Sequence, residues 1–566
     1  AVFAIARVTF EPVPPARPAN AADGGPPRQD DHAAHAERYL LPLALVADAT
    51  PRNEGPEPEA PVEQPERARQ TQTGTPFPDG VVLGPVMTPA GTRLLIDGCW
   101  HEGFRTALQA LLSGHETLEG LGGDMRGHPL HAPRLPGAPA ASGQASGTAA
   151  LRAAQSASRV LSAEQSNTSL VYGQGDEAVF VKLYRRIEEG VHPEPEMLRA
   201  LSGHTTFRNA PGFLSSLRWT DRDGRAFTVA LAQEFWENAE DAWTFTLAGL
   251  KDMKDMKDMK RGTGDRNGGD DQAPRDRRAA RHGLPDTLRQ TAALLGERVA
   301  AFHQATASVP EEGFAPRAFT RDDVREAGDR ARASLAAGLH DLERRLAGLQ
   351  SAGDHEADGP DEAFPVADAR ALLAERARLE ARIDHAVQTF ESTAGAGLKI
   401  RTHGDLHLGQ ILILRRADGS RDAGLLDFEG EPGRPLAAAR RLQSPLRDVA
   451  GMLRSFHYAA HATARSGDAG ASFDPEAASG ALQEAFLDRY FSTLDDRMPP
   501  APDRDARPSV LPAAAPTRHA LLDVFLLEKA AYELAYECDN RPAWAGIPIR
   551  GLLSLSQGPT PPAPSA

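Results

Sequence analysis

The chain has 566 residues, 41% of them hydrophobic, which is enough material for two or three domains with real cores. Its 63 basic and 78 acidic side chains give a formal net charge of −15, which disfavours a nucleic-acid partner. Because the chain has only two cysteines, no apolar run of about 18 residues and no signal segment at its start, we expect a cytoplasmic protein without disulfides or a membrane partner.

The first 155 residues alternate between regular patterns and low-complexity stretches. Strands are expected at residues 1–5, 39–46 and 93–97, and an amphipathic helix is expected at 101–112. Between them, stretches rich in Pro, Gly and Ala predict linkers or insertions at residues 12–36, 48–76 and 120–147. We therefore expect residues 1–155 to form an N-terminal cap region with disordered insertions.

Two β-branched runs, residues 169–173 and 178–184, predict a hairpin in a nucleotide-binding lobe that spans residues 156–250. Lys182 lies inside the second run, where its ammonium group could contact nucleotide phosphates. The alternative is an ordinary lysine on an edge strand. A helix with acidic residues in its first turn follows, and we expect Glu196 to pair with Lys182.

No G-x-G-x-x-G or Walker loop precedes this hairpin. Ser166, Asn167 and Thr168 stand where a turn that covers phosphates would lie, and their polar side chains and backbone N–H groups could do that work. We therefore assign these three residues to nucleotide binding.

The second half of the chain has mainly helical patterning. A repeated K-D-M triplet at residues 251–260 opens a polar stretch, 251–282, that we interpret as a solvated, charged insertion; its interleaved aspartates disfavour a basic tether. Helical periodicity then appears at residues 287–308, 321–350, 368–392 and 479–496, with loops at 351–363 and 499–516. Residues 283–556 are expected to form a helical lobe, and residues 557–566 a tail.

Two short motifs in this lobe indicate phosphoryl transfer. Residues 402–410 read T-H-G-D-L-H-L-G-Q, and Asp427 ends the apolar run that follows. The carboxylate of Asp405 can accept the proton of an attacking hydroxyl, while Gln410 and Asp427 can offer oxygen ligands to Mg²⁺ on the phosphates of ATP. Gly404 permits tight backbone geometry beside the proposed base.

The intervening residues predict the geometry that this chemistry needs. Residues 411–414 and 423–427 read as two strands joined by a turn, so the hairpin should bring Gln410 and Asp427 to one side of a single metal. The alternative is an ordinary hairpin with polar ends. Taken together, the motifs predict a kinase.

Near the C-terminus, residues 528–537 suggest a binding helix. Lys529, Tyr532 and Tyr536 fall at positions i, i+3 and i+7, so they project from one helical face, and aromatic faces with polar edges suit a sugar. The alternative is a pair of core tyrosines. His407 is open between a structural and a site role, while Arg447 and Asp448 are interpreted as structural.

Several blocks of the sequence resemble the bacterial maltokinases, and the similarity runs with interruptions from about residue 39 to 553. The blocks are residues 164–169, 403–410, 426–432 and 443–456. The resemblance implies an α+β, bilobal, protein-kinase-like fold with an N-terminal cap, a small β-rich N-lobe and a mostly helical C-lobe. It also implies phosphorylation of maltose at its anomeric hydroxyl with ATP and Mg²⁺, on the route from trehalose to α-glucan, with a trehalose synthase as a possible fused or associated partner.

The resemblance also implies roles for individual residues. Asp405 is the catalytic base, Gln410 and Asp427 are the Mg²⁺ ligands, and Lys182 and Glu196 are the nucleotide-lobe pair. Residues 232–235 would form the hinge whose backbone contacts adenine, so Gln233 and Phe235 are assigned to the nucleotide. Lys529, Tyr532 and Tyr536 match the positions that contact the disaccharide.

Two other functions remain open. A related small-molecule kinase acting on an aminoglycoside or on choline would share Asp405 and Asp427, although Lys529 beside two tyrosines disfavours a polycationic substrate. A non-catalytic pseudokinase or scaffold is the other alternative, and the presence of Lys182 and Gln410 speaks against it.

Overall fold

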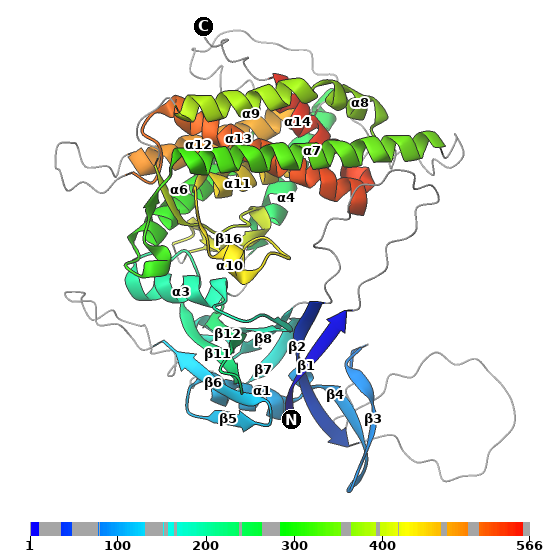
Figure 1. The fold of residues 1–566 in the computed structure, drawn as a ribbon, viewed down its shortest axis with the longest axis vertical. Coiled ribbons are helices and arrows are strands. Elements are labelled where there is room, and N and C mark those ends of the chain that lie inside the picture. The colour runs from blue at the N-terminus through cyan, green and yellow to red at the C-terminus, as the bar shows by residue number, and fades with distance from the viewer. Residues whose placement is uncertain are drawn as a thin grey trace, which may run out of the picture. The chain divides into compact units, whose positions relative to one another are not determined.

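The structure is a computed structural model, and its description covers most of the chain. The described residues are 2–10, 35–47, 77–78, 80–130, 151, 157–163, 167–236, 240–262, 284–351, 364–391, 397–416, 418–465, 473–495 and 509–557. The chain divides into two compact units, one made of Ala1–Arg199 and Pro211–Glu237 and the other of Ala200–Ala210 and Asn238–Ala566. The first is rich in sheet and the second is mainly helical (Figure 1), which confirms the expected fold class.

A seven-stranded antiparallel sheet forms the larger part of the first unit. Its strand order is β5-β6-β11-β12-β9-β8-β7. The strands are β5 (Thr117–Gly120), β6 (Gly123–Pro129), β7 (Ser158–Ala163), β8 (Asn167–Tyr172), β9 (Val179–Tyr184), β11 (Phe213–Asp221) and β12 (Ala226–Glu234). The predicted hairpin is confirmed as β8 and β9, joined through the 3-10 turn η2 (Gly175–Glu177).

A second sheet of the same unit contains the strands nearest the N-terminus. It consists of β1 (Val2–Phe10), β2 (His35–Ala47), β4 (Gly91–Asp97) and β3 (Val82–Thr88), with the short β10 (Arg186–Ile187) also paired to β2. The turn η1 (Gly98–Trp100) and helix α1 (Glu102–Leu112) follow β4. The apolar core of this sheet contains Ala44, Val81, Leu94 and Ile96. The strands and the helix predicted for this region are confirmed.

Strands β5 and β6, which fall within residues 1–155, lie in the same sheet as the strands of the expected nucleotide lobe. Strand β6 lies in the range interpreted as a linker, yet it pairs with β11 along its whole length. Only Met125 in this strand is a large buried apolar residue, so alternation is weak in the sequence. Gly127 packs so closely on α1 that a Cβ there would lie 1.9 Å from the Leu111 carbonyl oxygen. Residues 12–34, 48–76 and 131–147 lie outside the described residues.

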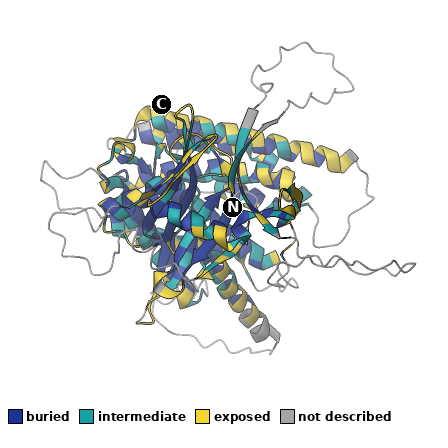
Figure 2. Ribbon diagram, turned by 90° about the horizontal axis from the view of Figure 1, so that it is seen from below, coloured by how far each residue is buried: buried dark blue, intermediate teal, exposed yellow. Residues whose placement is uncertain are grey.

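The second unit is built mainly from helices whose inner faces are buried (Figure 2). They are α4 (Ala242–Gly262), α6 (Asp286–Ser308), α7 (Arg321–Ser351), α8 (Val366–Ala374), α9 (Arg376–Glu391), α10 (Leu436–Ala439), α11 (Leu446–Arg465), α12 (Pro475–Asp495), α13 (Ala515–Asn540) and α14 (Gly546–Gln557). Helix α3 (Pro193–His204) begins in the first unit, and its last residues belong to the second. The helical predictions are confirmed, and none of the described helices is long and apolar enough to cross a membrane.

The K-D-M repeat is helical, and over residues 251–255 it is not fully solvated, because two of these five side chains are buried. It continues α4, with Met253 and Lys254 buried and the Lys254 ammonium 3.5 Å from the Thr463 carbonyl oxygen. Lys and Met are good helix formers, and residues three apart share a helical face, so the repeat can extend a helix. Residues 263–282 lie outside the described part of the chain.

Short strands position the loops of the second unit. Strands β13 (Glu240–Asp241), β16 (Ile411–Arg415) and β17 (Arg421–Leu425) form one sheet, and β14 (Arg317–Ala318), β15 (Leu398–Arg401) and β18 (Leu442–Gln443) form another. The 3-10 turns are η3 (Glu312–Phe314), η4 (Leu408–Gln410) and η5 (Pro542–Trp544). Ile411 pairs with Leu425, which confirms the predicted β16–β17 hairpin and sets the residues just outside it side by side.

Candidate active site

The β16–β17 hairpin brings Gln410 and Asp427 into contact. The Gln410 side-chain amide donates to Asp427 Oδ2 at 2.9 Å, and the Leu426 backbone N–H donates to the Gln410 carbonyl oxygen at 2.9 Å. The geometric expectation is therefore confirmed. An amide oxygen and a carboxylate at this spacing are ligands of the type that Mg²⁺ takes, so the residues present fit that ion.

Asp427 has an unusual backbone conformation. Its φ of 64° is the only positive value of a non-glycine residue in the described part of the chain. This left-handed region costs an L residue about 1 kcal/mol or more, and it persists only where the surroundings impose it. Such strain concentrates at functional sites, so it supports Asp427 as a functional residue.

The backbone of the loop that carries Asp405 is hydrogen-bonded to the side chain of Asp448 on α11. The Asp448 carboxylate accepts from the backbone N–H groups of His403 at 2.8 Å and Gly404 at 3.0 Å. It also contacts His303 Nε2 at 3.0 Å, and His303 Nδ1 in turn contacts the Tyr490 hydroxyl at 2.9 Å. Asp448 is therefore structural, as expected, but its partners His303 and Tyr490 were not found from the sequence.

The ionisation of Asp448 suits this role. Its burial alone would favour the neutral acid, yet the hydrogen bonds from His303 and from the Gly404 backbone hold the pKa of Asp448 below its usual value. The carboxylate can thus accept from two backbone donors at neutral pH. A charged acceptor makes these hydrogen bonds stronger than neutral ones.

Helix α11 supports the same loop at two further positions. A Cβ on Gly451 would lie 2.4 Å from the Leu406 carbonyl oxygen, and the Leu408 N–H donates to Ser455 Oγ at 3.1 Å. Asp448, Gly451 and Ser455 are spaced at i, i+3 and i+7, so one face of the helix holds the loop. Gly404, with φ of 91°, confirms the tight geometry predicted beside Asp405.

Asp405 meets the predicted binding helix directly. Lys529 Nζ lies 3.3 Å from Asp405 Oδ1, and both side chains keep part of their surface exposed. Burial disfavours the ammonium form, but Asp405, Glu533 and Glu431 outweigh it and raise the pKa of Lys529. Lys529 is therefore a cation at neutral pH, and it contacts the carboxylate that is predicted to be the base.

A cavity of about 310 Å³ opens beside Asp405 and Lys529. Tyr532 and Tyr536 line it and are 50% and 45% exposed, which rules against the alternative that they are core residues. The cavity wall also contains side chains that were not predicted, namely Trp243, Tyr458, Glu533, Glu537, Arg541 and Trp544. Aromatic rings around a cleft with a few polar groups are typical of a small-molecule site.

The two unpredicted glutamates of this cavity both accept hydrogen bonds from neighbouring side chains. Glu533 accepts from Arg454 at 2.7 Å, and Glu537 accepts from the Tyr458 hydroxyl at 3.1 Å and from Arg541 at 2.7 Å. Burial raises the pKa of Glu537. Glu533 and Glu537 follow Lys529 by four and eight residues, a spacing that could have identified them from the sequence.

His407 makes a structural hydrogen bond and also lines the cavity, so the structure does not choose between the two roles left open for it. Its imidazole accepts from the Gly409 backbone N–H at 3.1 Å, which caps η4, and the same residue lines the cavity beside Asp405. Burial lowers the pKa of His407, so the ring is neutral near pH 7.

In the first unit, the lysine of strand β9 pairs with a different glutamate from the one expected. Lys182 Nζ lies 3.2 Å from Glu194 Oε2, which also accepts from the Tyr184 hydroxyl at 2.8 Å. Glu194 is 2% exposed, whereas Glu196 is only partly buried. Because α3 begins at Pro193, its first turn directs Glu194 and not Glu196 at the lysine, a register that composition could not reveal.

The remaining nucleotide assignments have different outcomes. Ser166 lies outside the described residues, and Asn167 and Thr168 belong to strand β8 and not to a turn. The buried Thr168 hydroxyl accepts from Arg185 Nε at 2.9 Å, so it is not presented to a phosphate.

The hinge assignment falls at the end of strand β12. The backbone of Gln233 is paired with Phe180, and the Phe235 N–H donates to the Ala178 carbonyl oxygen at 3.2 Å. The buried Gln233 Oε1 has no hydrogen-bond partner among the described residues. The contact of this segment with adenine stays a prediction.

Comparison with known proteins finds kinases that are similar to this chain. No family model matches the chain. A glucosamine kinase of Mycolicibacterium smegmatis is 27% identical over 403 residues, which cover 70% of this chain and 79% of that protein. A solved glucosamine kinase in complex with glucosamine, ADP and inorganic phosphate is 19% identical and superposes with a TM-score of 0.52 over 92% of this chain and 90% of the other. A second crystal form gives a TM-score of 0.51 at 19% identity over 92% of this chain and 89% of that chain.

These similarities define the class of protein at the level of the fold. The chain has the fold of a small-molecule kinase, with a sheet-rich N-terminal unit and a helical C-terminal unit. In the helical unit, Gln410 and Asp427 are in contact, and Asp405 lines the cavity beside Lys529.

Proposed function

We propose that the protein is an ATP-dependent kinase that transfers the γ-phosphoryl group to a hydroxyl of a small sugar. One observation carries this proposal: Asp405 lies in the wall of an aromatic cavity and is held by Lys529, while Gln410 and Asp427 are in contact at the end of the hairpin that follows its loop. A base, a pair of oxygen ligands and an acceptor cavity are the parts that this reaction needs.

The chemistry requires little covalent work from the protein. Asp405 would accept the proton of the sugar hydroxyl as its oxygen bonds to the γ-phosphorus and the bond to the ADP oxygen breaks. Lys529 would hold the Asp405 carboxylate in place. Gln410 and Asp427 would hold Mg²⁺, which when bound neutralises charge on the nucleotide phosphates.

In the first unit, Lys182 is the residue best suited to contact the phosphates. Its ammonium is positioned by Glu194, which is itself fixed by Tyr184. An ion pair of this kind keeps a lysine in one rotamer, and its ammonium group can act as a point charge on phosphate oxygens.

The acceptor site favours a sugar because of its ring faces. Tyr532, Tyr536, Trp243 and Trp544 surround the cavity, and their faces can pack on the C–H patches of a pyranose while its hydroxyls reach the polar groups between them. We propose maltose as the acceptor, phosphorylated at its anomeric hydroxyl, because the sequence resembles the maltokinases over the motifs that form this site. Four aromatic side chains would suit two sugar rings.

A hexosamine is the second candidate, and a different observation favours it. Glu533 and Glu537 line the cavity, and carboxylates can bind the ammonium group of an amino sugar. The relative at 27% identity is a glucosamine kinase, which supports the same choice.

An acceptor panel separates the two candidates. The full chain would be incubated with Mg-ATP and with maltose, glucosamine, glucose or an aminoglycoside, and ADP formation and the position of the phosphate would be measured. Maltose 1-phosphate as the main product supports the first candidate, and a glucosamine phosphate supports the second. Transfer to none of the sugars would contradict the proposed function.

A further inference from the structure

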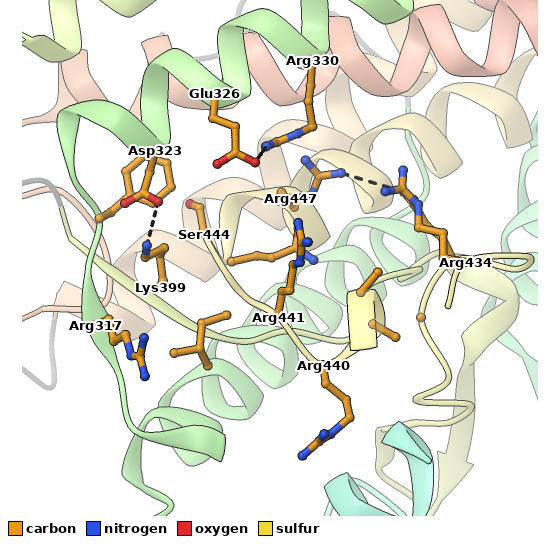
Figure 3. Close-up of a pocket in the computed structure, with 18 of the residues that line it drawn as sticks. Arg317, Asp323, Glu326, Arg330, Lys399, Arg434, Arg440, Arg441, Ser444 and Arg447 are labelled. Atoms are coloured by element: carbon orange, nitrogen blue, oxygen red, sulfur yellow. Dashed lines mark hydrogen bonds and ion pairs between the residues drawn. The ribbon is translucent and has the colours of Figure 1, made fainter. Parts of the chain in front are cut away.

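A second cavity of the helical unit has a strongly cationic lining. It has a volume of about 480 Å³ and is lined by residues before and within α7, from β15, and from the loop between β17 and α11 (Figure 3). It does not include Asp405, although Gly404 forms part of its wall. Seven of its lining residues are Arg or Lys and four are Asp or Glu, an excess of three positive charges in a chain whose net charge is −15.

Two of these cations, Lys399 and Arg330, form ion pairs with carboxylates of α7. Lys399 Nζ lies 2.6 Å from Asp323 Oδ1, and Arg330 lies 2.9 Å from Glu326 and 3.4 Å from Glu528. Figure 3 shows the first two of these ion pairs at the α7 side of the cavity. These ion pairs lie in the cavity wall. Because each pair is neutral, it does not contribute to the excess of positive charge.

Two more cations, Arg434 and Arg447, also form ion pairs with carboxylates. Arg447 lies 2.8 Å from Glu528 Oε2 and 3.9 Å from Glu431, and Arg434 forms an ion pair with Glu431. Glu528 contacts both Arg330 and Arg447, so the three arginines Arg330, Arg434 and Arg447 are balanced by the three carboxylates of Glu326, Glu431 and Glu528.

Three arginines remain, of which Arg440 is only partly exposed. Arg317 and Arg441 are both exposed, and neither has a carboxylate within ion-pair distance among the described residues. Arg317 comes from the short strand β14, and Arg441 comes from the segment between α10 and β18. Two arginines brought by separate segments to one concave wall repel each other unless an anion lies near them.

We propose that this cavity binds a small molecule that bears a phosphate monoester. A phosphate monoester carries about −1.5 to −2 charges at pH 7, which matches the two unpaired guanidinium groups, and guanidinium forks suit phosphate oxygens. Ser444 and Gln443 offer neutral hydrogen-bonding groups, and Phe319 and Phe525 offer apolar faces to the organic part of the ligand. A cavity of this volume accommodates a sugar phosphate. The inference stands apart from the proposed kinase function, because it concerns binding without transfer.

The test is calorimetric titration of the full chain in EDTA, without Mg²⁺ or nucleotide. The probes are glucose 6-phosphate, inorganic phosphate and uncharged glucose. We expect both phosphate compounds to bind and glucose not to bind, with an affinity that falls as salt rises. Tighter binding of glucose 6-phosphate than of inorganic phosphate would identify a sugar phosphate as the ligand, and equal binding would identify the phosphate alone.

A double variant, Arg317→Gln with Arg441→Gln, assigns the binding to this cavity. We expect it to weaken phosphate binding by at least about tenfold while leaving the melting temperature unchanged, because both side chains are exposed and unpaired. Arg370→Gln is the matched control, since Arg370 is an exposed arginine of α8 that lines none of the cavities described above.

Three results would overturn the inference. They are absence of binding by both phosphate compounds, binding that the double variant leaves intact, and displacement of glucose 6-phosphate by an equal amount of ADP. The last result would assign the phosphate to the nucleotide site. Asp405→Asn should leave this binding unchanged, so a failure of the proposed catalytic function is distinguishable from a failure of this inference.

Discussion

Lys529 Nζ lies 3.3 Å from Asp405 Oδ1, although the two residues are 124 positions apart in the chain. One comes from helix α13 and the other from the loop between β15 and η4. The contact joins the proposed acceptor helix to the proposed catalytic base. Sequence reasoning assigned both residues to a site but did not connect them.

Removal of one aromatic side chain from the cavity should weaken binding of the sugar acceptor and leave binding of the nucleotide unchanged. We expect Tyr532→Ala to raise the KM for the sugar by about tenfold or more, because a stacking face worth roughly 1 to 2 kcal/mol is lost. Tyr532 is half exposed, so stability should hardly change. Steady-state kinetics with the sugar and ATP varied in turn measure this, and an equal rise in the KM for ATP would contradict the assignment.

The two glutamates near the start of α3 provide a matched pair. Glu194→Gln should lower kcat/KM for ATP by about tenfold, because Lys182 loses its charged partner. Glu196→Gln should change the same quantity by less than about twofold. A larger loss in the Glu196 variant would restore the pairing that the sequence suggested, and thermal melts of both variants control for misfolding.

The close approach of α11 to the catalytic loop predicts an effect of a single methyl group. Gly451→Ala should reduce kcat by about tenfold or more and lower the melting temperature, since the new Cβ would lie 2.4 Å from the Leu406 carbonyl oxygen.

Gly480→Ala is the matched control for this substitution. Gly480 lies in α12 with open space around the position of a Cβ. The variant should be stabilised by roughly 0.5 to 1 kcal/mol without loss of activity. Equal kcat and equal melting temperature of the Gly451→Ala and Gly480→Ala variants would contradict the proposal that Gly451 allows α11 to approach the catalytic loop.

A buried histidine predicts loss of stability in acid. Burial, together with the charge of Arg454, lowers the pKa of His457 to about 3. Between about pH 6.5 and pH 3 the unfolded chain therefore binds a proton that the folded protein does not, so stability falls as pH falls through this window. For this one group the loss at pH 5 is about 2 kcal/mol.

Urea unfolding at pH 7.5 and pH 5 measures this loss. His457→Gln should flatten the difference between the two pH values, because glutamine does not titrate. The same pH dependence in the variant and the natural chain would remove His457 as its source.

The sequence predicted most local structure because local patterns carry it. The hairpin from Ile411 to Leu425, the helical face of Tyr532 and Tyr536, and the tight backbone at Gly404 all follow from spacing and residue type. Each depends on residues close together in the chain.

The sequence could not supply what depends on tertiary packing. The choice of Glu194 over Glu196 depends on where α3 begins, and the buried support of Asp448 by His303 joins residues 145 positions apart. Strand β6 gave no clear alternation because its close packing on α1 requires glycine. The K-D-M repeat, with its charged composition, gave no sign that Lys254 would be buried.

The central claim is that Asp405 is the base of a phosphoryl transfer to a sugar, and a comparison of the natural chain with Asp405→Asn tests it most directly. Single-turnover transfer of labelled phosphate from Mg-ATP to the acceptor should slow by about 100- to 10,000-fold in the variant, while its ATP affinity stays within about twofold. Transfer at the natural rate in the Asp405→Asn variant would contradict the account.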